Sequence, residues 1–336
     1  MPPPMISVVI SAYNYGKFLE QSIKSALGQD YPKHSFEIIV IDDGSTDNTP
    51  EIANKYNEQI KYIRQKNAGQ AGVFNTAFRE SNGEILCFLD ADDYWYPGKL
   101  KTIIPVFEKY ADAGMVQHHS DFVDANSNPL KNKFEKLPNF YDLEYFKNNR
   151  VYFNGTTNLS FRKTFLSNIM PEPPAMGIYA DQYLYWNILF YAKVYNLNST
   201  LAAHRVHGSN WYAKMYINPD MISMHINVLE AVNVSVRANF KKLAVPLTKE
   251  PPALLEQDME VKKEKIILCR LQLKLFKALT AYGSLFKNRF SGFTFFKIMT
   301  LFLALIHPGL YLYFFRLYSK TDLLPKIRER LMPSKN

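Results

Sequence analysis

Phe36-Glu-Ile-Ile-Val-Ile-Asp-Asp-Gly-Ser-Thr-Asp47 is the stretch that decides the fold. It begins as a short run of aromatic and β-branched side chains, typical of a buried strand, and ends in an acidic turn containing Gly and Ser. Thr49-Pro50-Glu51 then reads as a helix start, with Thr49 as N-cap, proline at the first helical position and an acid in the first turn. The stretch predicts a strand, a polar loop and a helix in direct succession.

The same alternation continues on both sides of this stretch. Further strands are predicted at Ile6–Ile10, Ile60–Arg64 and Glu84–Leu89, and helices at Tyr15–Leu27 and Gly69–Arg79. Strands that alternate with helices of this length predict an α/β protein with a mostly parallel sheet and right-handed crossovers. Such sheets bind ligands beyond the carboxyl ends of their strands, so we expect the loops after Ile10, Ile41 and Leu89 to meet at one edge.

Charge divides the 336-residue chain into two regions. The chain has 40 Lys and Arg against 31 Asp and Glu, a formal net charge of +9. Residues 220–336 hold about 19 of the basic and about 9 of the acidic residues, a net charge of roughly +10, so the whole excess lies there. We expect a near-neutral region 1–219, which argues against a nucleic-acid partner, and a basic region 220–336. The two cysteines exclude a disulfide framework or multi-Cys zinc site and are typical of a reduced intracellular compartment.

Polar residues follow three of the predicted strands. They are Ser11-Ala-Tyr-Asn14, Asp42-Asp43-Gly44-Ser45 and Asp90-Ala-Asp92-Asp93. Five carboxylates at one edge repel one another unless a cation or ligand donors offset their charge. Carboxylates without a nearby Cys suit a hard divalent ion such as Mg²⁺ or Mn²⁺, which a diphosphate would need in order to approach them. Taken singly, each acidic segment is also typical of a solvated turn.

Four segments in this order resemble the family 2 glycosyltransferases of the GT-A fold. They are Ser-Ala-Tyr-Asn (11–14), Val-Ile-Asp-Asp-Gly-Ser-Thr-Asp (40–47), Asn-Ala-Gly-Gln-Ala (67–71) with Asn75, and Phe-Leu-Asp-Ala-Asp-Asp-Tyr-Trp (88–95). The resemblance covers roughly residues 5–215. It implies a mixed, mostly parallel sheet flanked by helices, here followed by a helical tail. It also implies metal-dependent, inverting transfer of a sugar from a nucleotide-diphospho-sugar to an acceptor hydroxyl.

Carried over residue by residue, the resemblance implies a role for each acid. Ala12 and Asp43, or its neighbour Asp42, line the pocket of the nucleotide base, Asp92 holds the metal, and Asp90 or Asp93 faces the ribose and donor sugar. The remaining implied donor contacts are Ser11, Tyr13, Asn14, Gly69, Asn75 and Arg205. The Arg-Val-His-Gly-Ser-Asn segment (205–210) also resembles the family and implies that His207 is a second metal ligand. A strand-end histidine bonded to backbone is the alternative.

Asp181 is the catalytic base that the resemblance implies. The family has an acid, often Glu-Asp, at the start of a helix after the central loops, and this chain has Tyr179-Ala-Asp-Gln-Tyr-Leu184 there. An acid is also common in the first turn of any helix. Thr156 and Thr157 are implied contacts on the acceptor side. The Gln-X-X-Arg-Trp segment of processive members does not follow Asp181, which favours single addition.

Residues 220–336 are predicted to be mostly helical and to associate with an anionic membrane surface. Val261–Phe286 alternates Lys and Arg with apolar residues, as basic amphipathic helices do. Ile298–Phe315 is free of formal charge, but His307-Pro-Gly309 interrupts it, leaving two pieces that are each too short to span a bilayer. We expect an enzyme at the cytoplasmic face of the membrane; a helical subdomain packed on the core is the alternative. Together with the resemblance, the tail implies a glycan or lipid-linked acceptor in surface polysaccharide synthesis.

Two other enzyme classes lack their signatures here. A nucleotidyltransferase has a Gly-rich, Arg-containing loop after its first strand and a Rossmann dehydrogenase has Gly-X-Gly-X-X-Gly; Ser11–Gly16 contains neither. A transferase-like binding protein or inactive scaffold stays open, because the Glu before Asp181 is missing. The sequence leaves the sugar, nucleotide base, acceptor, linkage and oligomeric state undetermined.

Overall fold

The computed structural model describes residues 5–132, 134–177, 179–207, 210, 218–272, 274, 277–280, 282, 302 and 305–307. The chain divides into two compact units. Unit 1 comprises Met1–Asn210 and Glu230–Leu255, and unit 2 comprises Trp211–Leu229 and Glu256–Asn336. Helices α9 (Pro219–Lys242) and α10 (Pro252–Leu271) each contribute to both units.

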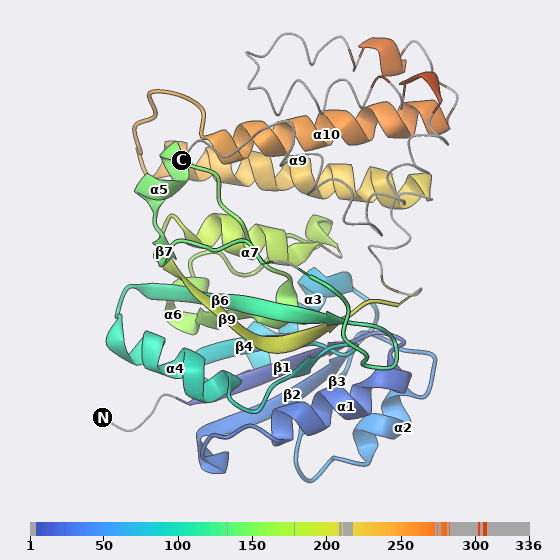
Figure 1. Cartoon of the computed structure of the whole chain (residues 1–336), viewed down its shortest axis with the longest axis vertical. Coiled ribbons are helices and arrows are strands. Elements are labelled where there is room, and N and C mark those ends of the chain that lie inside the picture. The colour runs from blue at the N-terminus through green and yellow to red at the C-terminus, as the bar shows by residue number, and fades with distance from the viewer. Residues whose placement is uncertain are drawn as a thin grey trace. The chain divides into compact units, whose positions relative to one another are not determined.

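Unit 1 is an α/β structure built on one sheet (Figure 1). Its strands are β1 (Ile6–Ala12), β2 (Phe36–Asp42), β3 (Lys61–Arg64), β4 (Ile85–Asp90), β5 (Tyr94–Trp95), β6 (Ala113–Val123), β7 (Phe140–Tyr141), β8 (Leu159–Arg162) and β9 (Lys193–Arg205). Its helices are α1 (Gly16–Leu27), α2 (Thr49–Asn54), α3 (Gly69–Glu80), α4 (Lys99–Lys109), α5 (Leu143–Asn148), α6 (Lys163–Leu166) and α7 (Ala180–Ile188), with short 3₁₀ turns η1 (Lys33–Ser35), η2 (Thr156–Asn158) and η3 (Pro174–Met176).

The sheet combines a parallel half with a mixed half. Its strand order is β3-β2-β1-β4-β8-β6-β9-β5, and β7 also pairs with β9. Strands β3, β2, β1 and β4 are parallel, whereas β8 is antiparallel to both β4 and β6. The parallel half brings the carboxyl ends of β1, β2 and β4 to the same edge, as the alternating pattern predicts.

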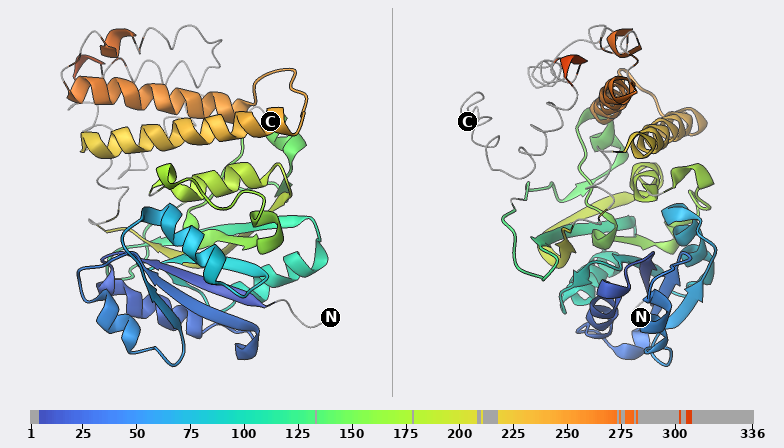
Figure 2. Two further views of the ribbon diagram at one scale, coloured as in Figure 1. Left: turned by 180° about the vertical axis from the view of Figure 1, so that it is seen from behind. Right: turned by 90° about the vertical axis from the view of Figure 1, so that its right-hand side faces the viewer.

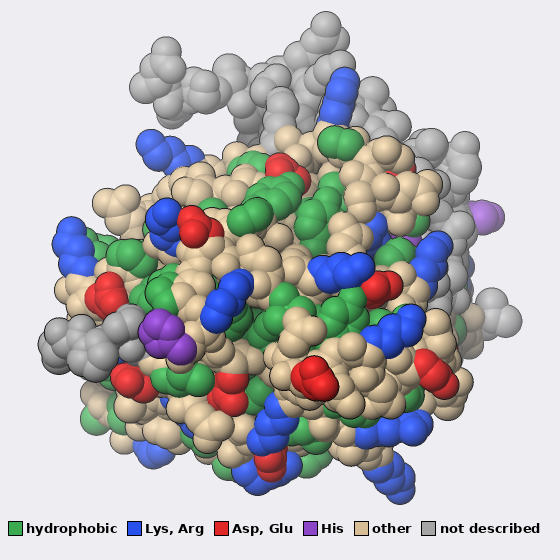
Figure 3. All heavy atoms as spheres, turned by 90° about the horizontal axis from the view of Figure 1, so that it is seen from below, with side chains coloured by type: hydrophobic (Ala, Val, Ile, Leu, Met, Phe, Trp, Pro, Cys, Tyr) green, Lys and Arg blue, Asp and Glu red, His purple; other side chains and the backbone are tan. Residues whose placement is uncertain are grey.

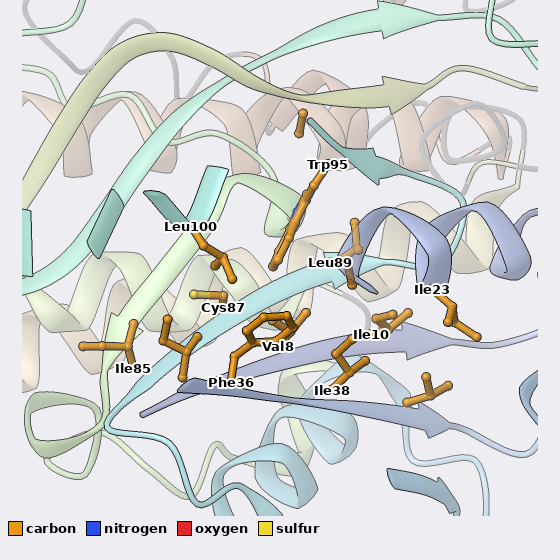
Figure 4. Packing of buried hydrophobic residues seen from close by; sticks show 14 of the residues in the cluster. Val8, Ile10, Ile23, Phe36, Ile38, Ile85, Cys87, Leu89, Trp95 and Leu100 are labelled. Atoms are coloured by element: carbon orange, nitrogen blue, oxygen red, sulfur yellow. The ribbon is translucent and has the colours of Figure 1, made fainter. Parts of the chain in front are cut away.

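Helices cover both faces of the parallel half because its strands are apolar on both sides. Val8 and Ile10 of β1 point toward α1 and α4, in one core with Ile23 and Leu100 (Figure 4). Helix α3 packs on the other face, where the rings of Phe74 and Phe88 lie 4.5 Å apart. The left view of Figure 2, seen from behind, shows α3 in front of the sheet. These continuous apolar strands are what the sequence predicted for this half.

Two features differ from the sequence prediction. Thr49 is not the N-cap of the second helix. Instead α2 begins at Thr49 and Asn48 is its N-cap residue, while the Thr49 N–H donates to the side chain of Asp47, two positions earlier, at 3.0 Å. The long pair β6 and β9, which runs parallel through register shifts, was not anticipated in residues 110–215. Its side chains do not alternate cleanly, because most of β6 is buried on both faces.

Acidic and basic side chains are interspersed on the outer side of unit 1. Figure 3 shows this face from below, the side where α1 and α2 lie in Figure 1. The pattern agrees with the near-neutral charge of residues 1–219.

Unit 2 contains the start of α9 and most of α10, so the predicted helical C-terminal region is confirmed where the structure describes it. Ile222, Ile226 and Leu229 of α9 share an apolar cluster with Val261 and Ile266 of α10. Within this unit His225 Nδ1 lies 2.8 Å from Glu264 Oε1. The described helices include none that is both long enough and apolar enough to cross a bilayer. Most of Ile298–Phe315, the predicted interfacial segment, lies outside the described residues.

Candidate active site

The site is built on the carboxyl ends of β1, β2 and β4. Backbone pairing sets Ala12 opposite Asp42 and Ser11 opposite Asp90. The loops continue this pairing, since the N–H of Asp43 donates to Ala12 O at 2.9 Å and that of Ala91 to Ser11 O at 3.0 Å. The sheet therefore fixes the backbone of both acidic segments on either side of β1.

Asp43 faces the start of helix α3. Its Oδ1 accepts hydrogen bonds from Gln65 Nε2 at 2.7 Å and Ala68 N at 2.9 Å, and its Oδ2 accepts one from Gly69 N at 2.9 Å. A carboxylate has about four acceptor positions, so these donors leave room for one more. Gly69 has φ of +72°, a left-handed conformation that glycine adopts without strain.

Asp42, the alternative base-pocket residue, points toward β3 instead. Its Oδ1 accepts from Ser45 N at 2.8 Å, and its Oδ2 accepts from the Tyr62 hydroxyl at 2.7 Å and lies 3.6 Å from Arg64 Nε. The side chain is fully buried. These contacts hold the loop, whereas Asp43 is the acid beside α3.

Asp90 lies at the end of β4, where Ser11 Oγ donates to its Oδ1 at 2.9 Å. Burial, together with the neighbouring Asp93 and Asp92, raises the pKa of Asp90 well above its usual range, and Asp181 adds to the rise. Asp181 is therefore close enough to Asp90 to act on it electrostatically, although 91 positions of sequence separate them.

Asp92 and His207, the two predicted metal ligands, lie next to each other. His207 Nε2 lies 3.1 Å from Asp92 Oδ2, and Asn210 Nδ2 lies 3.1 Å from the same oxygen. Burial and the nearby Asp93 raise the pKa of Asp92, which means that a cation would be favoured there. Tyr15 packs its ring edge against the His207 ring, with centroids 5.7 Å apart.

The donor set fits a divalent ion that shares its coordination with substrate. Within the described part of the chain, no three His, Cys, Asp or Glu side chains gather into a metal-holding group. Mg²⁺ and its like are commonly held by one or two protein ligands, with substrate phosphates and water supplying the rest. Asp92 and His207 meet that requirement.

Asp93, which follows β4, is hydrogen-bonded to Arg205 at the end of β9 and to Thr157 in η2. Asp93 Oδ1 accepts from Arg205 N at 2.7 Å, and its Oδ2 accepts from the Thr157 hydroxyl at 2.5 Å and lies 3.1 Å from His204 Nδ1. Burial disfavours the charged His204 ring, but the Asp93 carboxylate outweighs it and raises the pKa of His204 to about 9.

The Arg205 guanidinium is enclosed by protein. Nε donates to Asp92 O at 2.8 Å, Nη1 to Ala125 O at 3.1 Å and Nη2 to Gln21 Oε1 at 2.7 Å, and the side chain is 1% exposed. Its predicted contact with the diphosphate stays a prediction, since these donors already have acceptors.

Asp181 stands in the first turn of α7, next to Thr156. The Thr156 hydroxyl lies 3.2 Å from Asp181 Oδ2, and both belong to unit 1. Glu172, two residues before the start of η3, is almost fully buried, and burial together with the charge of Asp181 raises its pKa well above the usual range.

The remaining predicted residues have varied surroundings. Tyr13 and Asn14 are exposed, and Asn14 Oδ1 accepts from Thr46 N at 2.7 Å. Asn75 does not face the strand ends: its amide bonds both ways with the backbone of Glu172, at 2.7 Å and 3.0 Å. Its role as a donor contact stays a prediction.

Several residues near these groups were not singled out from the sequence. They are Tyr15, Gln70, Glu172, His204 and Asn210. Gln70 lies within the Asn-Ala-Gly-Gln-Ala segment, and His204 and Asn210 flank or end the Arg-Val-His-Gly-Ser-Asn segment, so their motifs contained the signal. Glu172 had no such signal.

Comparisons with known proteins agree with this arrangement. The family model described as Glycosyl transferase family 2 matches residues 7–170. An uncharacterized glycosyltransferase from Nostoc sp. is 36% identical over 214 residues, which cover 61% of this chain and 66% of that protein. The poly(ribitol-phosphate) beta-N-acetylglucosaminyltransferase TarS of Staphylococcus aureus is 34% identical over 119 residues, 34% of this chain and 19% of TarS. The chain therefore spans at most about two thirds of these relatives.

Solved structures show the fold. The structure of S. aureus TarS 1–349 in complex with UDP matches with a TM-score of 0.54 at 20% identity, covering 83% of this chain and 89% of that one. The mannosyltransferase PcManGT from Pyrobaculum calidifontis, in complex with GDP-Man and Mn²⁺, matches with a TM-score of 0.52 at 16% identity, covering 99% and 88%. The predicted GT-A architecture, a mixed sheet flanked by helices, is confirmed.

Proposed function

The chain belongs to glycosyl transferase family 2 through its residues 7–170, and we propose that it transfers a single sugar from a nucleotide-diphospho-sugar to an acceptor hydroxyl with inversion. One observation carries the proposal. Asp90 ends β4 and its N–H donates to Thr157 Oγ1 at 3.2 Å, while the hydroxyl of the adjacent Thr156 lies 3.2 Å from Asp181 Oδ2, so η2 connects the acid at the sheet edge with Asp181 on α7. A donor bound at the strand ends would therefore meet a base supplied by α7.

The donor is held by groups from three strands in this proposal. Asp43 has one acceptor position left for an N–H of the nucleotide base, after its bonds to Gln65, Ala68 and Gly69. Asp90 accepts from Ser11 and keeps its second oxygen for a sugar or ribose hydroxyl. The TarS structures hold UDP and UDP-GlcNAc and the mannosyltransferase holds GDP-Man, which supports a nucleoside diphosphate sugar as donor.

Asp92 and His207 would hold the divalent ion, Mg²⁺ or Mn²⁺, at the diphosphate. When bound there, the ion offsets the negative charge that develops on the leaving nucleoside diphosphate. Asp92 Oδ2 and His207 Nε2 lie 3.1 Å apart, close enough for both to bind one ion, and the Asn210 amide donates to the same Asp92 oxygen. The Mn²⁺ in the mannosyltransferase complex supports this part of the proposal.

Asp181 acts as the general base. It takes the proton of the acceptor hydroxyl while the oxygen forms its bond to the anomeric carbon and the bond from that carbon to the diphosphate oxygen breaks. The Thr156 hydroxyl donates to one oxygen of this carboxylate, at 3.2 Å, which orients the base. Base and leaving group on opposite faces of the sugar require in-line displacement, and hence inversion.

Release of nucleoside diphosphate tests the function. The full chain is incubated with Mn²⁺ and a panel of UDP- and GDP-sugars, with and without candidate glycan and lipid-linked acceptors. We expect metal-dependent release from one donor that an acceptor accelerates. Tight binding of a donor without release under any condition would instead favour the transferase-like binding protein or scaffold.

Peripheral association with an anionic membrane is a separate part of the proposal. It is supported by the charge of residues 220–336, since a cationic residue near anionic lipid contributes about 1 kcal/mol. Residues 230–255 belong to unit 1, so a truncation near 220 would damage the transferase unit. Co-sedimentation should therefore compare the full chain with a full-length variant carrying Gln at Lys287, Arg289 and Lys297. Equal binding to phosphatidylserine vesicles would contradict the proposal.

A further inference from the structure

The side-chain amide of Gln70 lies between the base and its hydroxyl partner. Gln70 Nε2 is 2.8 Å from Thr156 Oγ1, and Ala180 N, the first N–H of α7, is 3.0 Å from Gln70 Oε1. The Thr156 hydroxyl is in turn 3.2 Å from Asp181 Oδ2. One amide thus touches both neighbours of the Asp181 carboxylate, across sequence separations of 86 and 110 positions.

The direction of each hydrogen bond follows from the donor and acceptor types. A backbone N–H can only donate, so the amide oxygen of Gln70 must face Ala180. The amide nitrogen then faces Thr156 and donates to its oxygen. The hydroxyl of Thr156 keeps its own hydrogen, and the Asp181 carboxylate is the acceptor within reach. The three hydrogen bonds form a chain from Ala180 through Gln70 and Thr156, and bonds in such a chain polarise and strengthen one another.

Gln70 is itself held from two sides. The residue before it, Gly69, donates its N–H to Asp43, and the residue after it, Ala71, donates its N–H to Gly177 O at 3.0 Å. A Cβ added to Gly69 would lie 3.1 Å from the carbonyl oxygen of Gly177, so α3 and the 171–177 loop are in close contact. The backbone that carries the Gln70 side chain is therefore fixed at both neighbours, by Asp43 on one side and by the loop before α7 on the other.

We propose that Gln70 is a positioning residue for the base: its amide turns the Thr156 hydroxyl toward Asp181 and caps the first turn of α7. The inference rests on the proposed function, which makes Asp181 the base. Displacement of a reacting group by about 1 Å costs about 10²-fold in rate, so losing the amide should slow transfer without weakening donor binding.

Gln70→Glu separates this role from simple helix capping. A carboxylate accepts from the N–H groups at a helix start at least as well as an amide, so a cap alone would be preserved. It cannot donate to Thr156, and it draws the Thr156 hydroxyl away from Asp181. Asp181 raises the pKa of both Asp90 and Glu172, so this variant adds a negative charge to a site that is already acidic.

The experiment measures kcat and donor KM of the full chain for Gln70→Glu, Gln70→Ala, Thr156→Val and Thr156→Ser. We expect kcat to fall 10- to 100-fold in the first three, donor KM to stay within about twofold, and Thr156→Ser to keep most of the activity because it retains the hydroxyl. Gln70→Ala combined with Thr156→Val should be no slower than the slower single variant, because both remove one unit. A thermal melt with and without UDP confirms that each variant is folded.

The outcomes separate the inference from the function on which it rests. If the wild type transfers sugar and Asp181→Asn does not, but Gln70→Glu keeps its kcat, Gln70 is only a cap and the inference is overturned alone. The same holds if the two single losses multiply in the double variant. An active Asp181→Asn, or a wild type that transfers from no donor, overturns the base assignment and the inference together.

Discussion

His207 Nε2 lies 3.1 Å from Asp92 Oδ2, although 115 positions separate the two residues in the chain. Asp92 follows β4 and His207 follows β9, two strands that have β8 and β6 between them in the sheet. The distance between the two residues is therefore set by the pairing of β4, β8, β6 and β9, and both side chains are buried. Its imidazole and carboxylate are the ligands that we propose for the divalent ion.

His207→Ala should weaken the metal dependence of transfer. Loss of a ligand or of its partner commonly costs 10- to 100-fold in metal affinity, so half-maximal activity should require at least about ten times more Mn²⁺. The measurement is nucleoside diphosphate release across a Mn²⁺ titration. His34→Ala, at an exposed histidine of η1, is the matched control and should leave the titration unchanged. A His207→Ala curve that overlays the wild type would show that the imidazole is not a ligand.

Arg205→Lys should destabilise unit 1. The guanidinium donates to Asp92 O, Ala125 O and Gln21, and a lysine ammonium cannot reach all three from one point. Acceptors left buried without donors cost on the order of 3 kcal/mol in total. Urea unfolding measures this loss. A variant of normal stability whose donor KM rises sharply would instead support the predicted diphosphate contact.

Lys99 should make stability depend on pH. It is fully buried on α4, with Nζ 3.5 Å from the centroid of the Trp95 ring and 2.9 Å from Thr157 O. Burial lowers the pKa of Lys99 to about 7. Between that pH and about 10.5 the unfolded chain keeps a proton that the folded chain has lost, so stability contributed by this group rises with pH.

Lys99→Met removes this contribution and is the comparison that isolates it. We expect the unfolding free energy of the wild type, measured relative to that of the variant, to increase by roughly 1 kcal/mol per pH unit from pH 7.5 to 9.5. Urea titrations at four pH values give the difference. Two stability curves that run parallel over this range would show that Lys99 stays charged in the folded chain.

The parallel half of the fold could be predicted from the sequence, because each of its strands is specified by the pattern of residues next to one another in the chain. Runs such as Phe36–Asp42 are apolar on both faces and end in a polar loop, which specifies a buried parallel strand and the site at its end. The mixed half could not, since β8 reaches its place between β4 and β6 only through pairing with strands far along the chain. The residues of β8 alone do not indicate which distant strands it pairs with.

The candidate site divides in the same way. Asp43, Asp90 and Asp92 lie in recognisable segments at strand ends, and the sequence located them. The surroundings of the site residues had to come from the structure: Asp42 accepts a hydrogen bond within its own loop, the Arg205 guanidinium is enclosed by protein, and the pKa of the buried Glu172 is raised partly by Asp181. Charge and hydrogen-bond partners arise from contacts between distant segments, and these are absent from the order of the residues.

The central claim is that Asp181 is the base of a sugar transfer, and single-turnover kinetics of Asp181→Asn test it most directly. Asparagine keeps the shape and the contact with Thr156 but cannot take the proton. With saturating donor, Mn²⁺ and acceptor, transfer should fall by about 10²-fold or more, while UDP or GDP binds as it does to the wild type. An Asp181→Asn chain that transfers at close to the wild-type rate would contradict the account.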